Sequence, residues 1–168
     1  MGGDDSVTVL GKVSGTVRAG DGRDQVTIAV TANVLNGGLV DAGLGADAVD
    51  IEGVVSAGEV RGGADADALN LLPTSQVLPN GRVGGSDGND SITADLGAKL
   101  EGRVEGNQGD DAVDVLGEVA SGGRINGNLG NDLLSAVVNN GTVDGGAGSG
   151  DRCLVGAGNR PINCEILS

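Results

Sequence analysis

Pairs of apolar residues recur along the chain at intervals of about twenty residues. The two members of a pair lie two positions apart, and the residue between them is polar in seven of the eight pairs. Alternation with a period of two predicts a short β-strand with one buried face. The pairs are Val7/Val9, Val26/Ile28, Val49/Ile51, Leu69/Leu71, Ile92/Ala94, Val113/Val115, Leu134/Ala136 and Cys153/Val155.

A second apolar position recurs once in each unit, and it is filled by Val17, Val40, Val60, Val83, Val104, Ile125, Val143 and Ile162. Every strand pair is preceded, two residues earlier, by an aspartate. The spacing from the second apolar position to that aspartate is seven residues in six cases and eight in the seventh, whereas the other side of the unit varies from 11 to 16 residues. A turn that only reverses the chain can vary in length. The constant spacing therefore indicates a turn that stacks on its neighbours with a set geometry.

Internal repeats of this period are typical of solenoids. The aspartates follow one another at steps of 19 to 23 residues. We therefore expect an all-β fold, a parallel β-solenoid (β-roll or β-helix) of about eight coils. Residues 1–168 form a single domain in this interpretation, with residues 145–168 as a C-terminal cap.

The composition suits a thin, regular interior. The 168 residues include 34 glycines and no aromatic residue, so Val, Leu, Ile and Ala carry nearly all the apolar surface. A globular core of this size normally uses aromatic side chains to fill its volume.

The net charge of −14 argues against nucleic acid or an anionic membrane as partner, because phosphate binding requires clustered Lys and Arg. No stretch approaches the ~20 apolar residues that cross a membrane, so we expect no membrane insertion. Residues Met1–Asp5 do not resemble a signal peptide, which suggests a mature form or a piece of a longer protein.

Glycine lies two residues before the aspartate in six of the eight fixed turns, as in Gly20-Asp21-Gly22-Arg23-Asp24. Such turns curl tightly and can direct carbonyl oxygens toward one place. Stacking the coils at ~4.8 Å would bring the aspartates into one column. Neighbouring carboxylates would then repel each other by ~1 kcal/mol even in water.

A hard cation between successive turns would relieve that repulsion, and Ca²⁺ accepts both carboxylate and carbonyl ligands. The predicted metal ligands are Asp5, Asp24, Asp47, Asp67, Asp90, Asp111, Asp132 and Asp151. The alternative is that each aspartate only accepts hydrogen bonds from the amides of its own turn.

Two cysteines, Cys153 and Cys164, fall in the last unit. They indicate a disulfide that closes the C-terminal end in an oxidising compartment, and two unrelated thiols are the alternative.

The pattern Gly-x-Gly-x-Asp-x-apolar resembles the nonapeptide of RTX, or haemolysin-type, calcium-binding repeats, over most of the chain. That resemblance implies a secreted protein whose Asp carboxylates and turn carbonyls bind Ca²⁺ between coils. The chain departs from the family because only one turn per coil matches, so we expect calcium along one edge. Asp65 replaces the glycine before Asp67, and Gly150 is inserted before Asp151.

We therefore expect a secreted or cell-surface, glycine-rich structural or adhesive rod that binds calcium and is not an enzyme. End-to-end self-association or attachment to a larger surface protein would suit it. Arg82, Arg103 and Arg124 share one register and should form an outward column, paired with Glu101, Glu105 and Glu118. Two alternatives remain: an ice-binding solenoid, for which Thr8 and Thr27 begin an interrupted threonine column, and a metal-free structural or filament-forming solenoid.

Overall fold

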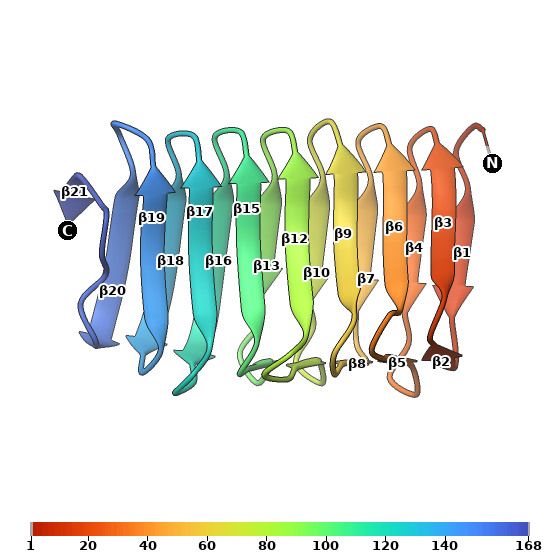
Figure 1. Ribbon diagram of the computed structural model, residues 1–168, viewed down its shortest axis with the longest axis horizontal. Coiled ribbons are helices and arrows are strands. Elements are labelled where there is room, and N and C mark those ends of the chain that lie inside the picture. The colour runs from red at the N-terminus through yellow and green to blue at the C-terminus, as the bar shows by residue number, and fades with distance from the viewer. Residues whose placement is uncertain (1, 168) are drawn as a thin grey trace.

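The computed structural model describes residues 2–167, which wind into a parallel β-solenoid with no helix among them. The strands lie side by side along the long axis, and the two termini lie at opposite ends (Figure 1). Accordingly, no helix long and apolar enough to cross a membrane occurs within these residues.

One long face is a sheet of seven parallel strands, in which each strand pairs in register with its counterparts in the adjacent coils. Its members are β3 (Thr16–Asp21), β6 (Leu39–Leu44), β9 (Glu59–Ala64), β12 (Arg82–Asp87), β15 (Arg103–Gln108), β17 (Arg124–Leu129) and β19 (Thr142–Ala147). The second apolar position of each unit lies on these strands. It occupies one register, since Val83 pairs with Val60 on one side and with Val104 on the other.

The opposite face is formed by the strands that the apolar pairs predict. They are β1 (Ser6–Val9), β4 (Gln25–Ile28), β7 (Ala48–Ile51), β10 (Ala68–Leu71), β13 (Ser91–Ala94), β16 (Ala112–Val119), β18 (Leu133–Asn139) and β20 (Arg152–Gly158). A last strand, β21 (Ile166–Leu167), pairs with β20. The prediction of an all-β parallel solenoid is thus confirmed, with seven strands on one face against eight long strands on the other.

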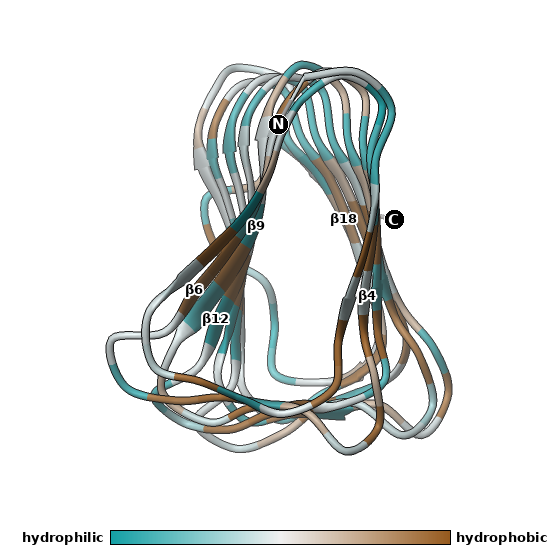
Figure 2. Ribbon diagram, turned by 90° about the vertical axis from the view of Figure 1, so that its right-hand side faces the viewer, coloured by the Kyte–Doolittle hydropathy of each residue, from teal (hydrophilic) through white to brown (hydrophobic). Residues whose placement is uncertain are grey.

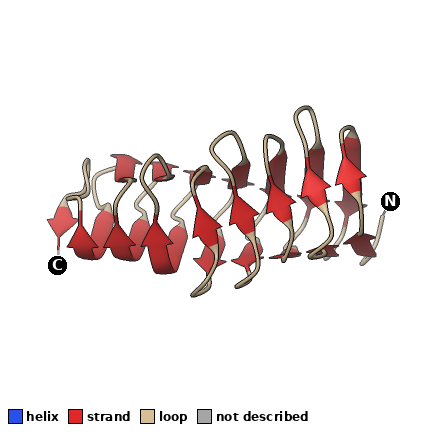
Figure 3. Cartoon of the chain, turned by 90° about the horizontal axis from the view of Figure 1, so that it is seen from below, coloured by secondary structure: helices blue, strands red, loops and turns tan. Residues whose placement is uncertain are grey.

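Short strands run along the third side of each early coil, so that the view down the axis shows a narrow turn at one end and a broad base at the other (Figure 2). These are β2 (Lys12–Val13), β5 (Asn33–Val34), β8 (Val54–Val55), β11 (Gln76–Val77) and β14 (Lys99–Leu100). The loops beside them are the segments of variable length, and they differ from coil to coil when seen from below (Figure 3).

The interior consists of aliphatic columns that run the length of the solenoid. Both members of most apolar pairs are fully buried, and Ile51 stacks on Ile28 and Leu71 in the adjacent coils. Burying one Val, Leu or Ile contributes roughly 1.5–3 kcal/mol. Because each coil contacts only its neighbours, stability adds up coil by coil.

Two details of the core differ from the sequence prediction. Ile162 is half exposed, because it pairs with Asp144 and so falls one residue out of the apolar register. A third apolar column also exists along the third side. It contains Val13, Val34, Val55, Val77 and Leu100 on the short strands and Val119 at the end of β16, all buried.

Candidate metal centre: a column of buried carboxylates

The eight predicted aspartates occupy equivalent positions at the narrow turn, each directly before a strand of the second face. The strands that follow them pair in register, as Ala112 does with Ser91 and with Leu133, so the aspartates stack on one another along the solenoid axis. Seven of the eight are at most 3% exposed, and Asp5 in the first coil is half-buried. We call this set the Asp column.

In every aspartate of the column except Asp5, one carboxylate oxygen links adjacent coils. The main-chain amide of each aspartate donates a hydrogen bond to Oδ1 of the aspartate in the next coil, as Asp90 does to Asp111 and Asp111 does to Asp132. Seven such bonds run from Asp5 to Asp151, with N–O distances of 2.7–2.9 Å. The alternative expectation, that each aspartate bonds to the amides of its own turn, is therefore wrong for these bonds.

The other oxygen has no partner. Oδ2 is buried and accepts no hydrogen bond from any described residue in all eight aspartates. These oxygens point into the turn: a Cβ placed on Gly85 would lie 1.9 Å from Oδ2 of Asp90, and one on Gly127 would lie 2.1 Å from Oδ2 of Asp132. Leaving a buried acceptor unsatisfied costs about 1–3 kcal/mol, and more for a charged group. A row of such atoms is the arrangement that a bound cation would satisfy.

Carbonyl groups of the same turns point from coil to coil. A Cβ on Gly109 would lie 1.9 Å from the carbonyl oxygen of Gly88, and a Cβ on Gly130 would lie 1.9 Å from that of Gly109. Both glycines also have positive φ, at 124° and 140°. Within the described residues, no main-chain amide donates to the carbonyl oxygens of Gly88 or Gly109. Glycine is thus required here for both close approach and backbone conformation, and the carbonyls remain available as ligands.

The two irregular turns keep the Asp column intact. Asp65 adopts a φ of 78°, so it takes the conformation that glycine provides in the other turns. The extra residue before Asp151 is absorbed within the turn, because Arg152 still pairs with Leu133. Asp151 is fully buried and accepts the amide of Asp132 like the others.

Burial strongly perturbs the ionisation of the Asp column. Desolvation raises the pKa of Asp67 and of Asp111 to about 7 and that of Asp132 to about 6. The pKa values of Asp47 and Asp90 are also raised, again chiefly by burial. The hydrogen bond from the adjacent coil opposes this effect, and neighbouring carboxylates reinforce it. The interior of the metal-free turn therefore disfavours negative charge, and a cation placed there would reverse that preference.

A second set of acids lies outside the same turns. Asp4, Asp21, Asp65, Asp87 and Asp110 are exposed, so they do not face the buried oxygens. Some of them organise the turn instead: Asp110 accepts a hydrogen bond from the amide of Asn131, at 2.8 Å, and its own amide donates to Oδ1 of Asn89.

The donor set fits calcium better than a metal that requires side-chain ligands. Nowhere in residues 2–167 do three or more His, Cys, Asp or Glu side chains come together in a group that could hold a metal. A cation between two coils would therefore combine carboxylate oxygens of the Asp column with turn carbonyls and water. All-oxygen ligation of that kind, in flexible geometry, is characteristic of Ca²⁺.

Other charged groups are far less distinctive. A groove of about 480 Å³ on the first face is lined by Arg18, Asp41 and Arg61, but both guanidinium groups pair with Oδ2 of Asp41. The outward column of Arg82, Arg103 and Arg124 is present in one register. Of its three expected acidic partners, only Glu105 pairs with this column, through Arg82. Glu101 instead pairs with Lys99, and Glu118 accepts a hydrogen bond from Asn140.

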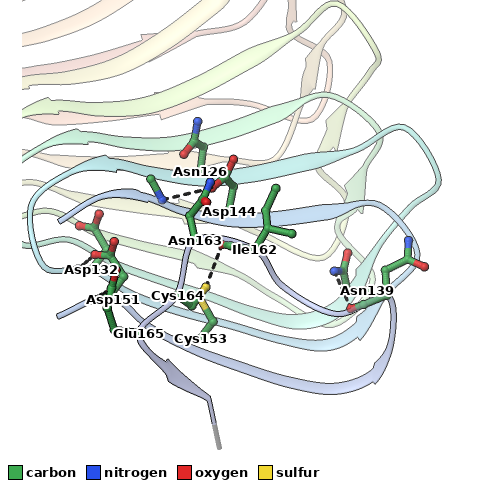
Figure 4. The surroundings of a disulfide bond; sticks show 12 residues. Asn126, Asp132, Asn139, Asp144, Asp151, Cys153, Ile162, Asn163, Cys164 and Glu165 are labelled. Atoms are coloured by element: carbon green, nitrogen blue, oxygen red, sulfur yellow. Dashed lines mark hydrogen bonds between the residues drawn. A yellow bond between two sulfur atoms is a disulfide. The ribbon is translucent and has the colours of Figure 1, made fainter. Parts of the chain in front are cut away.

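The C-terminal end contains the predicted disulfide between Cys153 and Cys164, with a Cα–Cα distance of 5.9 Å (Figure 4). Cys153 is buried in the apolar core, and Cys164 belongs to the segment that crosses the last coil. The bridge fastens that segment to the end of the solenoid.

Comparisons with known proteins support the fold and give one functional lead. No protein-family model matches the chain, and no curated protein matches its sequence. A solved structure is similar over 98% of the chain, with a TM-score of 0.63 and 25% sequence identity: the crystal structure of a hyperactive, Ca²⁺-dependent, β-helical antifreeze protein from an Antarctic bacterium. The present chain covers 56% of that structure's chain.

Proposed function

We propose that this chain is an extracellular calcium-binding β-solenoid module, in which Ca²⁺ ions lie between successive coils and stabilise the wound state. The observation that carries the proposal is the Asp column, with eight buried carboxylate oxygens that have no hydrogen-bond partner in the part of the chain that the structure describes. Isolated buried charges are costly, and proteins usually pair them or use them to coordinate metals. The Ca²⁺ dependence named for the similar antifreeze protein supports the same assignment.

Calcium would act on stability through mass action. A ligand that binds only the folded state stabilises it by about 2.7 kcal/mol when its concentration is 100 times its dissociation constant. Several sites would add further, and they would offset the ordering entropy of the many glycines. The module would be a stiff rod in calcium-rich surroundings and a weakly stable one elsewhere.

The rod would serve a structural or adhesive role outside the cell. The disulfide suits an oxidising compartment. Attachment to a larger surface protein or end-to-end association are the partners that this role implies. Catalysis has no part in the proposal.

Thermal unfolding followed by circular dichroism tests the proposal. The melting temperature should rise strongly when millimolar Ca²⁺ replaces a chelator, and Mg²⁺ at equal concentration should be far less effective because it prefers a rigid octahedral shell. Equal melting curves in Ca²⁺ and in chelator would refute the calcium assignment.

Ice binding is a second candidate, favoured by the similarity to an antifreeze protein and by the outer surface of the second face. That surface carries two regular columns, which contain mainly small or hydroxyl-bearing residues. One column contains Ser6, Gln25, Ala48, Ala68, Ser91, Ala112, Leu133 and Arg152, and the other contains Thr8, Thr27, Asp50, Asn70, Thr93, Asp114, Ser135 and Leu154. Only three of these positions are threonine.

A thermal-hysteresis measurement in Ca²⁺ separates the two candidates. If ice binds this face, Ala68→Arg in its middle should abolish hysteresis without changing the fold, whereas Asn126→Arg on the other long face should not. If the wild type shows no hysteresis but melts at a higher temperature in Ca²⁺, the chain is a calcium-stabilised rod without ice affinity.

A further inference from the structure

Glu165 lies where a ninth member of the Asp column would stand. Ile166, which follows it, pairs with Arg152, which follows Asp151. The main-chain amide of Asp151 donates a 2.7 Å hydrogen bond to Oε2 of Glu165, just as the amide of each earlier aspartate donates to the aspartate of the next coil. Asp132, Asp151 and Glu165 follow one another in Figure 4.

The turn before Glu165 is shortened. In the last full coil, Asp151 lies seven positions after Asp144. In the C-terminal segment that follows, Ile162 pairs with Asp144, and Glu165 lies only three positions after Ile162. The side chain of Glu165 nevertheless reaches the amide of Asp151. Asn163, with a φ of 52°, makes the tight turn that this shortening requires.

Asp151 contributes an unsatisfied buried acceptor. Asp151 is 0% exposed, and its Oδ2 accepts no hydrogen bond from the described residues, while its Oδ1 is occupied by the amide of Asp132. Glu165 is exposed, so its carboxylate can exchange ligands with solvent. An unpaired buried oxygen beside a second carboxylate is the same combination that recurs throughout the Asp column.

We infer that Asp151 and Glu165 form a terminal Ca²⁺ site, in which Glu165 replaces the aspartate of a missing coil. This inference rests on the proposed function of the Asp column. The terminal site is open to solvent through the exposed Glu165, so its ion should exchange faster than ions held between buried aspartates.

The disulfide positions Glu165. Cys164 directly precedes it, and the bond to Cys153 ties the segment to a core residue that is 1% exposed. The segment also makes hydrogen bonds to the last coil, from the amide of Gly145 to the carbonyl of Ile162, from the amide of Glu165 to the carbonyl of Asp151 and from Nδ2 of Asn163 to Asp144. Calcium affinity at the terminal site therefore depends on the disulfide.

Counting bound ions by native mass spectrometry of the chain in Ca²⁺ tests the inference. Glu165→Gln should bind one Ca²⁺ fewer than the wild type, or bind that ion at least ten-fold more weakly. The amide oxygen of Gln can still accept the hydrogen bond from Asp151, so capping is preserved while the charge is lost. Glu118→Gln, an exposed glutamate outside the Asp column, should retain the full count.

The double variant Cys153→Ala/Cys164→Ser, which lacks the disulfide, provides a second test. It should lose the same single ion, and adding Glu165→Gln to it should remove no further ion. If Glu165→Gln or the cysteine variant keeps the wild-type count and affinity, the terminal site is overturned while the Asp column stands. If the wild type itself binds no Ca²⁺, both proposals fall together.

Discussion

At the scale of single residues, the main feature of this protein is that the two carboxylate oxygens of each aspartate in the Asp column have different surroundings. In seven of the eight aspartates of the column, Oδ1 accepts the amide of the neighbouring coil, and in all eight Oδ2 is buried and accepts no hydrogen bond from residues 2–167. A hydrogen-bonding role alone would be met by Asn, whose oxygen accepts the same bond without charge. The proposed cation would account for the presence of a carboxylate at all eight positions.

Stability of the metal-free protein should fall as pH rises from about 4 to about 7. Unfolded aspartates titrate near 3.9, whereas burial raises the pKa of Asp67 and Asp111 to about 7. Between these values the folded state holds more protons than the unfolded state, so raising the pH favours unfolding. Each unit of pKa difference corresponds to about 1.4 kcal/mol.

Urea unfolding in chelator at pH 5 and pH 8 measures this effect. The midpoint should be lower at pH 8, and Ca²⁺ should raise it more at pH 8 than at pH 5 because the ion binds the ionised carboxylates. A metal-free midpoint that is higher at pH 8 would contradict the burial of unpaired carboxyl groups.

Asp111→Asn should change the stability in opposite directions with and without calcium. In chelator at pH 8 the variant should be more stable, by about 1 kcal/mol, because a buried charge is removed while the oxygen that accepts the amide of Asp90 remains. In Ca²⁺ it should be less stable than the wild type by several kcal/mol, because the sites on both sides of the residue lose a ligand.

The adjacent Asp110 provides a matched control, since it is exposed on the outside of the same turn. Asp110→Asn should leave the calcium-induced rise in melting temperature nearly unchanged. Equal effects of the two substitutions would show that position within the turn does not matter, and would argue against ligands in the buried column.

At the scale of secondary-structure elements, the narrow turn is the constrained part of each coil. Its glycines allow one coil to approach the next, and its fixed length keeps the aspartates aligned. The opposite side carries the variable loops and only short strands (Figure 2). The narrow turn does not vary in length because its aspartates must stack in register. The opposite side has no such requirement and therefore tolerates loops of different length.

Gly109→Ala should destabilise the protein by about 1–3 kcal/mol and weaken calcium binding. Its φ of 124° is strained for alanine, and the added Cβ would lie 1.9 Å from the carbonyl oxygen of Gly88. Gly117→Ala is the control, because its Cβ would meet no atom closer than 3.9 Å. Thermal unfolding and calorimetric Ca²⁺ titration of both variants check this prediction. A Gly109→Ala protein as stable as the Gly117→Ala protein would show that the turn tolerates side chains.

The repeat elements were largely predictable because alternation and spacing are local properties of the sequence. The strands before and after each narrow turn and the alignment of the Asp column follow from them directly. The third apolar column was missed, although Val34, Val55 and Val77 recur at steps of 21 and 22 residues. Strands of two residues are too short for their alternation to be recognised.

The end of the solenoid was the least predictable part. Glu165 lacks the glycine-rich turn that marks the other carboxylates, and its place follows only from the pairing of β21 with β20. Ile162 has the expected apolar character but pairs with Asp144, one residue away from the expected Val143. The segment after Asp151 departs from the repeat in both spacing and strand pairing, so rules drawn from the repeat do not apply to it.

At the scale of the whole molecule, charge balance links the composition to the fold. The chain carries a formal charge of −14, and eight stacked aspartates enclose seven positions between coils. Seven divalent cations there, with an eighth at the terminal site, would carry sixteen positive charges and so offset that deficit. Excess negative charge destabilises a compact state through self-repulsion, so calcium would stabilise the rod globally as well as at each turn.

Electrophoretic mobility tests the charge balance. In native gels at pH 8, the migration of the wild type toward the anode should fall steeply when Ca²⁺ replaces chelator, and much less in Mg²⁺ at equal ionic strength. Mobility that responds equally to the two ions would indicate general screening, with no specific uptake of calcium.

Anomalous diffraction from a crystal grown in Ca²⁺ is the most direct test of the central claim. Our account predicts a row of anomalous peaks along the narrow turn, one between successive aspartates at ~4.8 Å intervals, each within about 2.3–2.6 Å of a carboxylate Oδ2. A well-ordered map with calcium bound only elsewhere, and with every Oδ2 of the Asp column hydrogen-bonded to protein or water, would contradict it.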